Sequence, residues 1–184
     1  MNSRAEELML IGRVVAFDDR QAFARLVDLN TDSLRTYIFN LTGGDAVLTA
    51  DISQETFLKA YLSLRGFKGL SSFRTWLYRI AYHEYLDWIR LAGSAPETKQ
   101  PLDTAGGIEA ADNGASLVEM RHDISIAMQA LTPVERSLIT LFYYNDQPIK
   151  KISSIMSMPE GTVKVYLRRA KEKMAPHLQN YSTL

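Results

Sequence analysis

The sequence predicts an all-α protein made of two small helical domains joined by a flexible linker. Apolar residues recur at helical spacing through most of the chain, and almost no segment alternates as a strand would. Residues 92–117 instead combine glycine, proline, small and acidic residues, a composition typical of linkers. The length of 184 residues allows two small domains. We therefore expect domains at residues 1–91 and 118–184.

Four helices are expected before the linker, at about residues 5–16, 18–41, 46–64 and 71–91. The carboxylates of Asp18 and Asp19 suit the start of the second helix, where backbone N–H groups lack partners. Gly43 and Gly44 end that helix, since glycine readily adopts the left-handed conformation of a helix terminus, and Asp45 is placed to cap the third helix.

Four more helices are expected after the linker, at about residues 118–130, 133–145, 148–156 and 159–175. Pro133 and Pro148 each stand at a first helical position, where the missing N–H costs nothing. The last two helices are separated by the turn Ser157-Met158-Pro159 and carry matching apolar stripes: Ile149, Ile152 and Met156 on one, and Val163, Leu167, Ala170 and Met174 on the other. This arrangement predicts a helix-turn-helix.

Composition excludes several classes of protein. No apolar run approaches 18 residues and no basic-then-apolar leader is present, so we expect neither a membrane span nor a signal peptide. The absence of cysteine excludes disulfides and thiolate metal sites and fits a reducing compartment. His83, His122 and His177 lie far apart in sequence, and no metal, phosphate-loop or nucleophile motif occurs. We therefore expect no enzyme, no catalytic residue, no cofactor and no metal.

Charge is segregated along the chain although the net charge is zero. Basic residues gather at 59–90 and 164–173, whereas the linker is acidic. On the last helix Val165, Arg168 and Arg169 are predicted to point away from the core. Arginine can read guanine edges in a major groove, and lysine can meet phosphates. The alternative is a solvated basic face on an ordinary helical hairpin.

The fourth helix interleaves aromatic and basic residues, a pattern that suits single-stranded nucleic acid because bases stack on rings. The loop at residues 67–72 is small and flexible enough to surround one extruded base. The alternative places Phe73, Trp76 and Ile80 in the core and leaves the tyrosines to cover a bundle surface. The prediction therefore depends on the loop and the arginines more than on the aromatic residues, which include Tyr78, Tyr82, Tyr85 and Trp88.

The third helix has a polar, partly acidic face that includes Asp51, Gln54, Glu55 and Lys59. An acidic face beside a basic module repels phosphate, so it suits a protein partner better than DNA. An ordinary solvated face is the alternative.

Two pairs of motifs resemble the bacterial extracytoplasmic-function sigma factors. DISQETFLKAY at 51–61 with FKGLSSFRTWLYRIA at 67–81 resembles their domain 2. ALTPVERSLITLFYY at 130–144 with GTVKVYLRRAKEKM at 161–174 resembles their domain 4. The resemblance implies a cytoplasmic transcription initiation factor that binds core RNA polymerase, melts and reads the promoter −10 element with domain 2, and reads the −35 element with domain 4.

The resemblance also implies roles for individual residues. Polymerase binding would fall to Asp51, Gln54, Glu55 and Phe57. The −10 element would meet Lys68, Gly69, Leu70, Ser71, Ser72, Phe73, Arg74 and Arg79. The −35 element would meet Lys164, Val165, Tyr166, Arg168, Arg169 and Lys171. By the same resemblance we expect an anti-sigma factor, often membrane-anchored in the family, as a further partner.

Several positions depart from the family pattern, which predicts altered promoter preference. An acidic residue is common where Leu70 stands, and asparagine is frequent where His83 stands. Val165 and Tyr166 replace a frequent serine and arginine. Lys150 and Lys151 occupy the first helix of the motif, where acidic residues are usual.

Three other functions compete: a stand-alone helix-turn-helix regulator that binds palindromic DNA as a dimer, an enzyme, and a helical adaptor.

Overall fold

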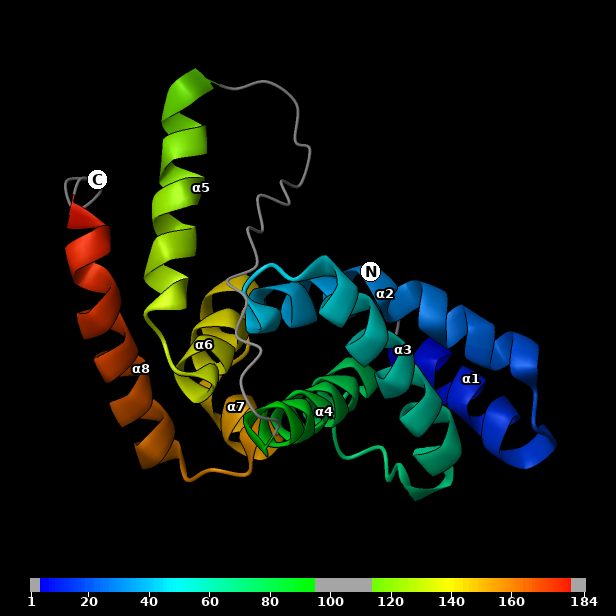
Figure 1. Cartoon of the computed structure of the whole chain (residues 1–184). Coiled ribbons are helices and arrows are strands. Elements are labelled where there is room, and N and C mark those ends of the chain that lie inside the picture. The colour runs from blue at the N-terminus through cyan, green and yellow to red at the C-terminus, as the bar shows by residue number, and fades with distance from the viewer. Residues whose placement is uncertain (1–3, 95–113, 180–184) are drawn as a thin grey trace. The chain divides into compact units, whose positions relative to one another are not determined.

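The computed structural model describes residues 4–94 and 114–179, and all regular structure in these ranges is helical (Figure 1). Contacts divide the chain into two compact units. The first comprises Met1–Ile38 and Val47–Thr98, and the second comprises Phe39–Ala46 and Lys99–Leu184. Most of the predicted linker lies outside the described residues. Its two ends are helical, since α4 extends to Ser94 and α5 begins at Gly114.

The first unit begins with α1, Arg4–Phe17, and with α2, Arg20–Thr42, of which the residues up to Ile38 belong to this unit. The predicted start of α2 is confirmed at Asp19, whose Oδ1 accepts a hydrogen bond of 3.0 Å from the N–H of Ala22. This bond, together with an ion pair of 2.6 Å to Arg13, lowers the pKa of the Asp19 carboxyl. The preceding residue, Asp18, accepts a hydrogen bond from the hydroxyl of Tyr61 on α3. Side chains of α1 and α3 thus both bind the turn between α1 and α2.

Glycines end α2 as the sequence predicts. Gly43 and Gly44 have φ values of +74° and +96°, a conformation that costs glycine little. The chain continues as α3, Ala46–Ser63, then a 3-10 turn at Leu64–Gly66, and then α4, Phe73–Ser94.

Aromatic pairs join the three longer helices of the first unit. The Tyr37 and Tyr78 rings join α2 to α4 with centroids 4.7 Å apart, and the Phe23 and Tyr61 rings join α2 to α3 at 4.9 Å. Stacked and edge-on rings at such spacing add to the free energy of burial. The fully buried side chains here also include Leu26, Leu34, Leu64, Phe73 and Leu77.

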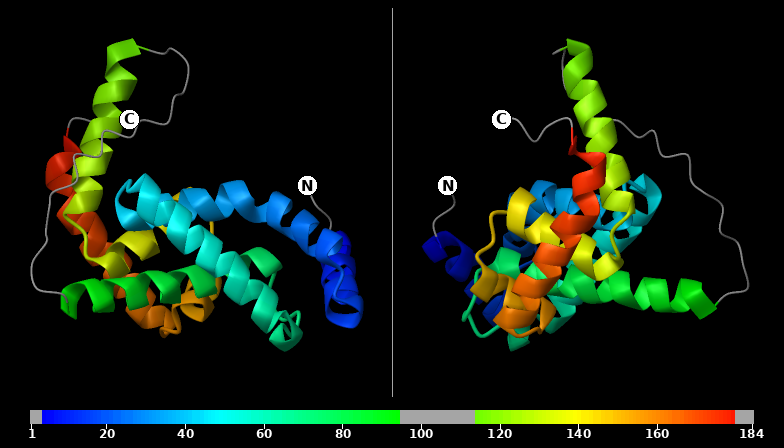
Figure 2. Two further views of the ribbon diagram at one scale, coloured as in Figure 1. Left: turned by 45° about the vertical axis from the view of Figure 1, so that its right-hand side comes forward. Right: turned by 90° about the vertical axis from the view of Figure 1, so that its left-hand side faces the viewer.

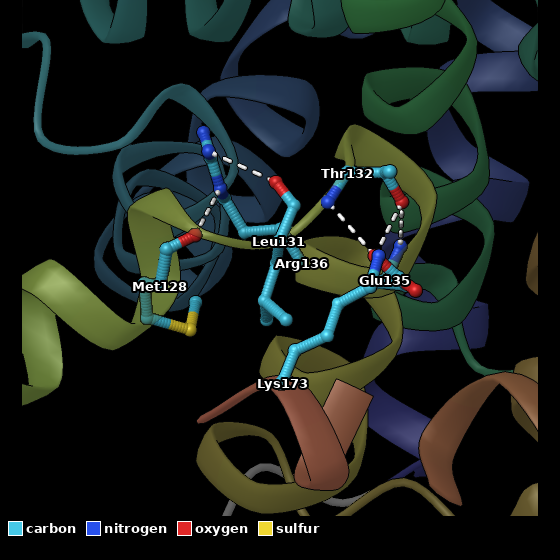
Figure 3. Close-up of polar contacts among 6 residues, drawn as sticks. All are labelled: Met128, Leu131, Thr132, Glu135, Arg136 and Lys173. Atoms are coloured by element: carbon cyan, nitrogen blue, oxygen red, sulfur yellow. Dashed lines mark hydrogen bonds and ion pairs between the residues drawn. The ribbon is translucent and has the colours of Figure 1, made fainter. Parts of the chain in front are cut away.

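The second unit contains α5, Gly114–Gln129, and α6, Pro133–Ile139, which continues as a π-helical turn at Thr140–Tyr144. Pro133 stands at the start of α6, as predicted, and Thr132 and Glu135 form a capping box. The N–H of Thr132 donates to Glu135 Oε2 at 2.9 Å, and the N–H of Glu135 donates to Thr132 Oγ1 at 3.3 Å (Figure 3). Reciprocal bonds of this kind fix the first turn of the helix.

Glu135 also ties α6 to the last helix. Its side chain is only 4% exposed, and Lys173 of α8 donates to it at 2.7 Å (Figure 3). Burial raises the pKa of Glu135, but the hydrogen bonds from Lys173 and Thr132 outweigh it and leave the pKa below its usual value. Arg136 joins α6 to the chain before it, donating to the carbonyls of Met128 at 3.2 Å and Leu131 at 3.4 Å.

The chain ends in the predicted helix-turn-helix: α7, Ile149–Met156, and α8, Glu160–Met174, followed by a 3-10 turn at Ala175–His177. Pro148 caps α7 from the preceding position and does not lie inside it, which moves this start one residue from the prediction. Ser157 turns the chain with φ at +55°, and the N–H of Met158 donates to the carbonyl of Ser153 at 3.0 Å. Figures 1 and 2 show α8 as an uninterrupted helix after this turn.

Most of each predicted apolar stripe is buried, while Ile149 and Met174 at the outer ends of the stripes are half-buried. Ile152 and Met156 of α7, with Ile155 between them, are at most 4% exposed, and Val163, Leu167 and Ala170 of α8 are at most 7% exposed. Within the described residues, no helix is long and apolar enough to span a bilayer.

Candidate nucleic-acid and protein interfaces

The outward face of α8 is basic and solvent-exposed. Lys164, Arg168, Arg169 and Lys171 are all exposed, and Val165 among them is 40% exposed. Tyr166 is half-buried. Arg168 lies 3.8 Å from Glu172 one turn later, a weak contact between two exposed groups that leaves the guanidinium available. Because the buried stripe fixes the opposite face, this helix presents its cations in the arrangement that a major groove accepts.

Tyr143 extends this face from the π-helical turn, a contribution that sequence reasoning missed. The Lys171 ammonium stands 5.2 Å from the centroid of the Tyr143 ring, within the range of a cation–π contact. Tyr143 is 46% exposed, so part of its surface is open to solvent beside the lysine. Lys150 and Lys151 on α7 are exposed as well. A helical pattern alone could not place Tyr143 here, because the contact joins residues far apart in sequence.

The loop between Gly66 and Phe73 presents its tip to solvent. Lys68 is exposed and Leu70 is 88% exposed, while Gly69 between them has φ at +67°. Ser72 closes the loop as the cap of α4, since its Oγ accepts a hydrogen bond of 3.2 Å from the N–H of Thr75. Its hydroxyl is thereby engaged in holding the helix start. Ser71 is half-buried.

Phe73 is corrected from a DNA contact to a core residue. Its side chain is fully buried, and its ring packs against Trp76 with centroids 5.7 Å apart and against Phe67 at 6.1 Å. Phe67 and Trp76 also pack at 5.2 Å. This three-ring cluster packs the loop against the start of α4. Burial of the Phe73 ring in it is more favourable than exposure to solvent.

For the tyrosines of α4, the structure favours packing within the bundle over base stacking. Tyr78, Tyr82 and Tyr85 are 1%, 3% and 5% exposed, so no base can stack on them in this structure. Their spacing along α4 puts all three on the side that faces the other helices. Trp88 differs, with 45% of its surface exposed.

An open pocket of about 290 Å³ lies beside the loop, between the 3-10 turn and α4. It brings together Arg79, which the sequence predicts as a DNA contact, and His83, the position that departs from the family pattern. Both are exposed, as is Arg74 one turn before Tyr78. The remaining lining comes from Ser63, Gly66, Trp76 and Ile80.

A second, larger groove of about 610 Å³ separates α3 from α4. Asp51 and Glu55 of α3 and Glu84 and Asp87 of α4 line it, so its rim is acidic. Lys59 lies within this rim, 2.6 Å from Glu84 and 3.9 Å from Glu55. The hydrogen bond to Glu84 raises the pKa of Lys59 above its usual value.

Apolar side chains accompany the acidic rim. Leu48, Ile52, Trp88 and Leu91 also line the groove, and Leu91 is 74% exposed. The remaining lining residue, Arg90, pairs with Asp87 at 3.1 Å. Gln54 is exposed on the same helix as Glu55, whereas Phe57 is half-buried. Exposed large apolar groups ringed by charges are typical of a surface that binds another protein. Sequence reasoning found the α3 half of this groove and missed the α4 half, which only packing brings alongside.

Comparison with known proteins gives consistent matches. Family models of sigma-70 region 2 and sigma-70 region 4 match residues 26–94 and 122–174. The chain is 30% identical to ECF RNA polymerase sigma factor SigW of Bacillus subtilis, over 95% of this chain and 99% of the relative. It is 28% identical to the ECF RNA polymerase sigma-E factor of Escherichia coli K12, over 97% of each chain.

Solved structures show the same fold. The chain is similar to CnrH in complex with the cytosolic domain of CnrY, with a TM-score of 0.69, 19% identity and coverage of 96% of this chain and 99% of the other. It is also similar to the sigma factor RpoE in complex with the anti-sigma factor NepR from Bartonella quintana, with a TM-score of 0.67, 22% identity and coverage of 85% and 96%.

Proposed function

Because the chain belongs to the extracytoplasmic-function RNA polymerase sigma factors, and so directs core RNA polymerase to promoters, we propose that three separate surfaces divide this work. The groove between α3 and α4 binds polymerase, the loop before α4 takes the −10 element, and α8 reads the −35 element. The observation that carries this division is charge segregation: the groove has an acidic rim, whereas the loop and α8 present cations.

This family membership excludes the stand-alone helix-turn-helix regulator, because the similarity spans both units and not the helix-turn-helix alone. The assigned work is binding and strand separation, so no residue is given a catalytic role. We assign residues 1–91 to sigma domain 2, residues 118–184 to sigma domain 4 and residues 92–117 to an acidic linker between them. The site of action is the cytoplasm, where the polymerase and the promoter are found.

Polymerase binds the α3 face through Asp51, Gln54 and Glu55. These exposed polar groups are flanked by apolar Leu58 and Leu62, which are 50% and 72% exposed on the same helix. A basic partner helix would pair with the carboxylates and cover the leucines, giving both orientation and buried area. Phe57 supports this face from a half-buried position.

The −10 element meets the first unit at the loop and the adjoining pocket. Lys68, Arg74 and Arg79 supply cations for the phosphates of the strand, and the pocket beside Trp76 offers an apolar wall to a base. Leu70 stands at the loop tip with 88% of its surface exposed, so the base it meets encounters an apolar group without hydrogen-bonding capacity. This supports a base preference at the −10 element that differs from the preference of relatives with an acidic residue at this position.

The −35 element meets the exposed face of α8. Arg168 and Arg169 read base edges, while Lys164 and Lys171 contact phosphates at either side. Val165 lies among them and offers a methyl-sized apolar surface to thymine. Tyr166 contributes from its half-buried position.

An anti-sigma factor is proposed as the regulatory partner. Of the solved structures similar in fold, the sigma factor RpoE is in complex with the anti-sigma factor NepR. A partner of this kind, membrane-anchored or free, would cover the acidic groove and the basic faces described here and so prevent access to both polymerase and promoter.

Co-elution with core RNA polymerase on a sizing column tests the polymerase assignment. The parent protein is expected to bind stoichiometrically. Glu55→Lys replaces the carboxylate that stands 3.9 Å from Lys59 with a cation on the proposed contact face, and we expect it to weaken binding about a hundredfold or more. Asp28→Lys, an equal charge reversal on the exposed side of α2, is the matched control. Equal binding by both variants would contradict the assignment of this groove.

A further inference from the structure

The first helix of the chain reaches the loop before α4 through three contacts. The Nη2 of Arg4 donates to the carbonyl of Gly69 at 3.0 Å. The carboxylate of Glu7 accepts from the N–H of Phe73 at 3.2 Å. The side chain of Leu8 lies against Gly69, at 3.7 Å from the place where a β-carbon would stand. These contacts join residues more than 60 positions apart, and all lie within the first unit.

The contacts fall at the two points of the loop that most need a partner. Gly69 has φ at +67° and lies outside the helices, so no helical hydrogen bond satisfies its carbonyl. Phe73 is the first residue of α4, where the N–H group has no partner within the helix. Arg4 satisfies the first group and Glu7 satisfies the second. One helix therefore fixes both the turn and the end of the loop.

The side chains on either side of the anchored point remain free to meet DNA. Lys68 is exposed and Leu70 is 88% exposed, whereas the Gly69 backbone between them is held by Arg4 and Leu8. A loop of this kind keeps its backbone conformation while its exposed side chains stay available for contact. A loop that must order itself on binding loses conformational entropy at that moment, and a preorganised one does not.

We propose that Arg4 and Glu7 are positioning residues for −10 recognition: they hold the loop in its base-receiving shape before DNA arrives, and so sharpen discrimination between bases. The inference rests on the proposed function of this loop as the site of the −10 base. Neither residue touches DNA in this role; each acts through the Gly69 carbonyl or the α4 N-terminus.

Arg4 and Glu7 lie outside the buried face of α1, so their proposed positioning role can be tested without disturbing the fold. The helix is attached to the unit through Leu10, Ile11 and Val14, which are at most 6% exposed. Arg4 is exposed and Glu7 is half-buried, both on the N-terminal side of that apolar stripe. Removing either side chain leaves the buried face of α1 intact, so the variants are expected to fold.

The test measures base discrimination by the complete holoenzyme, made from core polymerase and the full-length chain. A −10 strand is first selected by the parent holoenzyme from a randomised pool. Four single-stranded versions, each with a different base at the position most strongly selected, are then titrated against the parent, Arg4→Ala and Glu7→Ala. Glu7→Gln retains an acceptor oxygen and serves as the conservative variant, and Glu6→Ala is the matched control on the same turn of α1.

We expect the ratio of best-base to worst-base affinity to fall about three- to tenfold in Arg4→Ala and in Glu7→Ala, the scale of one lost hydrogen bond. Glu7→Gln and Glu6→Ala should keep most of the parent's ratio. Amide hydrogen exchange at residues 67–73 of the free chain should quicken in the two alanine variants, while polymerase co-elution and the unfolding midpoint stay unchanged.

Two results would overturn the inference. The ratio could stay at the parent value in both alanine variants, or affinity could fall equally for all four bases and leave the ratio intact. A parent holoenzyme without base preference would instead overturn the loop assignment itself, and the inference with it. Failure of the proposed function thus appears in the parent, and failure of this inference appears only in the variants.

Discussion

The loop before α4 and the helix α8 present similar cations on very different backbones. The backbone of α8 satisfies its hydrogen bonds internally, and its buried stripe of Val163, Leu167 and Ala170 fixes which side faces out. The loop has no such ladder, so its turn at Gly69 and its end at Phe73 take partners from α1. A helix suits the regular groove of duplex DNA, whereas a supported loop suits a single displaced base.

The difference also teaches where each surface is vulnerable. The α8 face should lose function when the core beneath it is disturbed or when an exposed cation is removed. The loop should lose function through substitutions on α1, which contacts the loop but is distant from it in sequence. Five substitutions, taken from the largest expected effect to the smallest, would break or sharpen this contrast.

The largest effect is expected from Val163→Asp in the core under α8. Val163 is fully buried, and an unpaired carboxylate at such a site costs roughly 3 to 5 kcal/mol. The second unit should unfold at lower denaturant while the first unit, with its own core, still melts as in the parent. Circular dichroism during urea unfolding would measure this. Val165→Asp, at a position 40% exposed on the same helix, is the control and should leave unfolding unchanged.

Glu135→Ala should destabilise the second unit by about 2 to 3 kcal/mol, because it removes the capping box and the bond to Lys173 together. The folded pKa of Glu135 is depressed, so its contribution is fully present above the ordinary value of 4.5 and is lost as pH falls through the folded pKa. The gap in unfolding free energy between parent and variant should therefore narrow on acidification. A gap that stays constant from pH 7 to pH 3 would contradict this.

Arg168→Ala should weaken binding to −35 duplex by about 1–3 kcal/mol and relax preference at one base step, if the guanidinium reads a guanine edge. The exposed pair with Glu172 contributes little, so folding should be unaffected. Fluorescence anisotropy with duplexes altered at single steps measures both effects. Equal losses on every duplex would reassign Arg168 to phosphate contact.

Gly69→Ala tests whether the backbone conformation of the loop matters for −10 binding. The space for a β-carbon is adequate, since Leu8 stands at 3.7 Å, but φ at +67° strains any residue other than glycine by about 1–2 kcal/mol. We expect weaker −10 strand binding by the holoenzyme with unchanged −35 affinity. Gly12→Ala, at an open position on α1 where nothing lies within 4 Å, is the control. Loss of −35 binding in Gly69→Ala would mean that the two surfaces are not separable.

The smallest effect is expected from Lys171→Ala. It removes a phosphate contact and the cation–π contact with Tyr143, so affinity should fall only a few-fold and uniformly across sequences. The slope of log affinity against log salt should become shallower by about 1. Titrations at several salt concentrations provide this slope. An unchanged slope would show that Lys171 does not neutralise a phosphate.

Local features of this protein follow from the sequence alone. The start of α2 at Asp19, its end at Gly43 and Gly44, the place of Pro133 at the start of α6 and the helix-turn-helix all agree with prediction. Each depends on a few neighbouring residues, through the period of the apolar pattern or the hydrogen bonds of a helix end. The exposed cations of α8 follow for the same reason, since the buried stripe decides the opposite face.

The tertiary structure alone decided which aromatic residues are available and what holds the loop. The spacing of Tyr78, Tyr82 and Tyr85 allows either exposure or burial, and only packing against the other helices buries them. The bonds from Arg4 and Glu7 to the loop, and from Lys173 to Glu135, join segments far apart in sequence. No local pattern encodes such contacts, because they arise only when the helices assemble and each buried or unpaired group meets a partner.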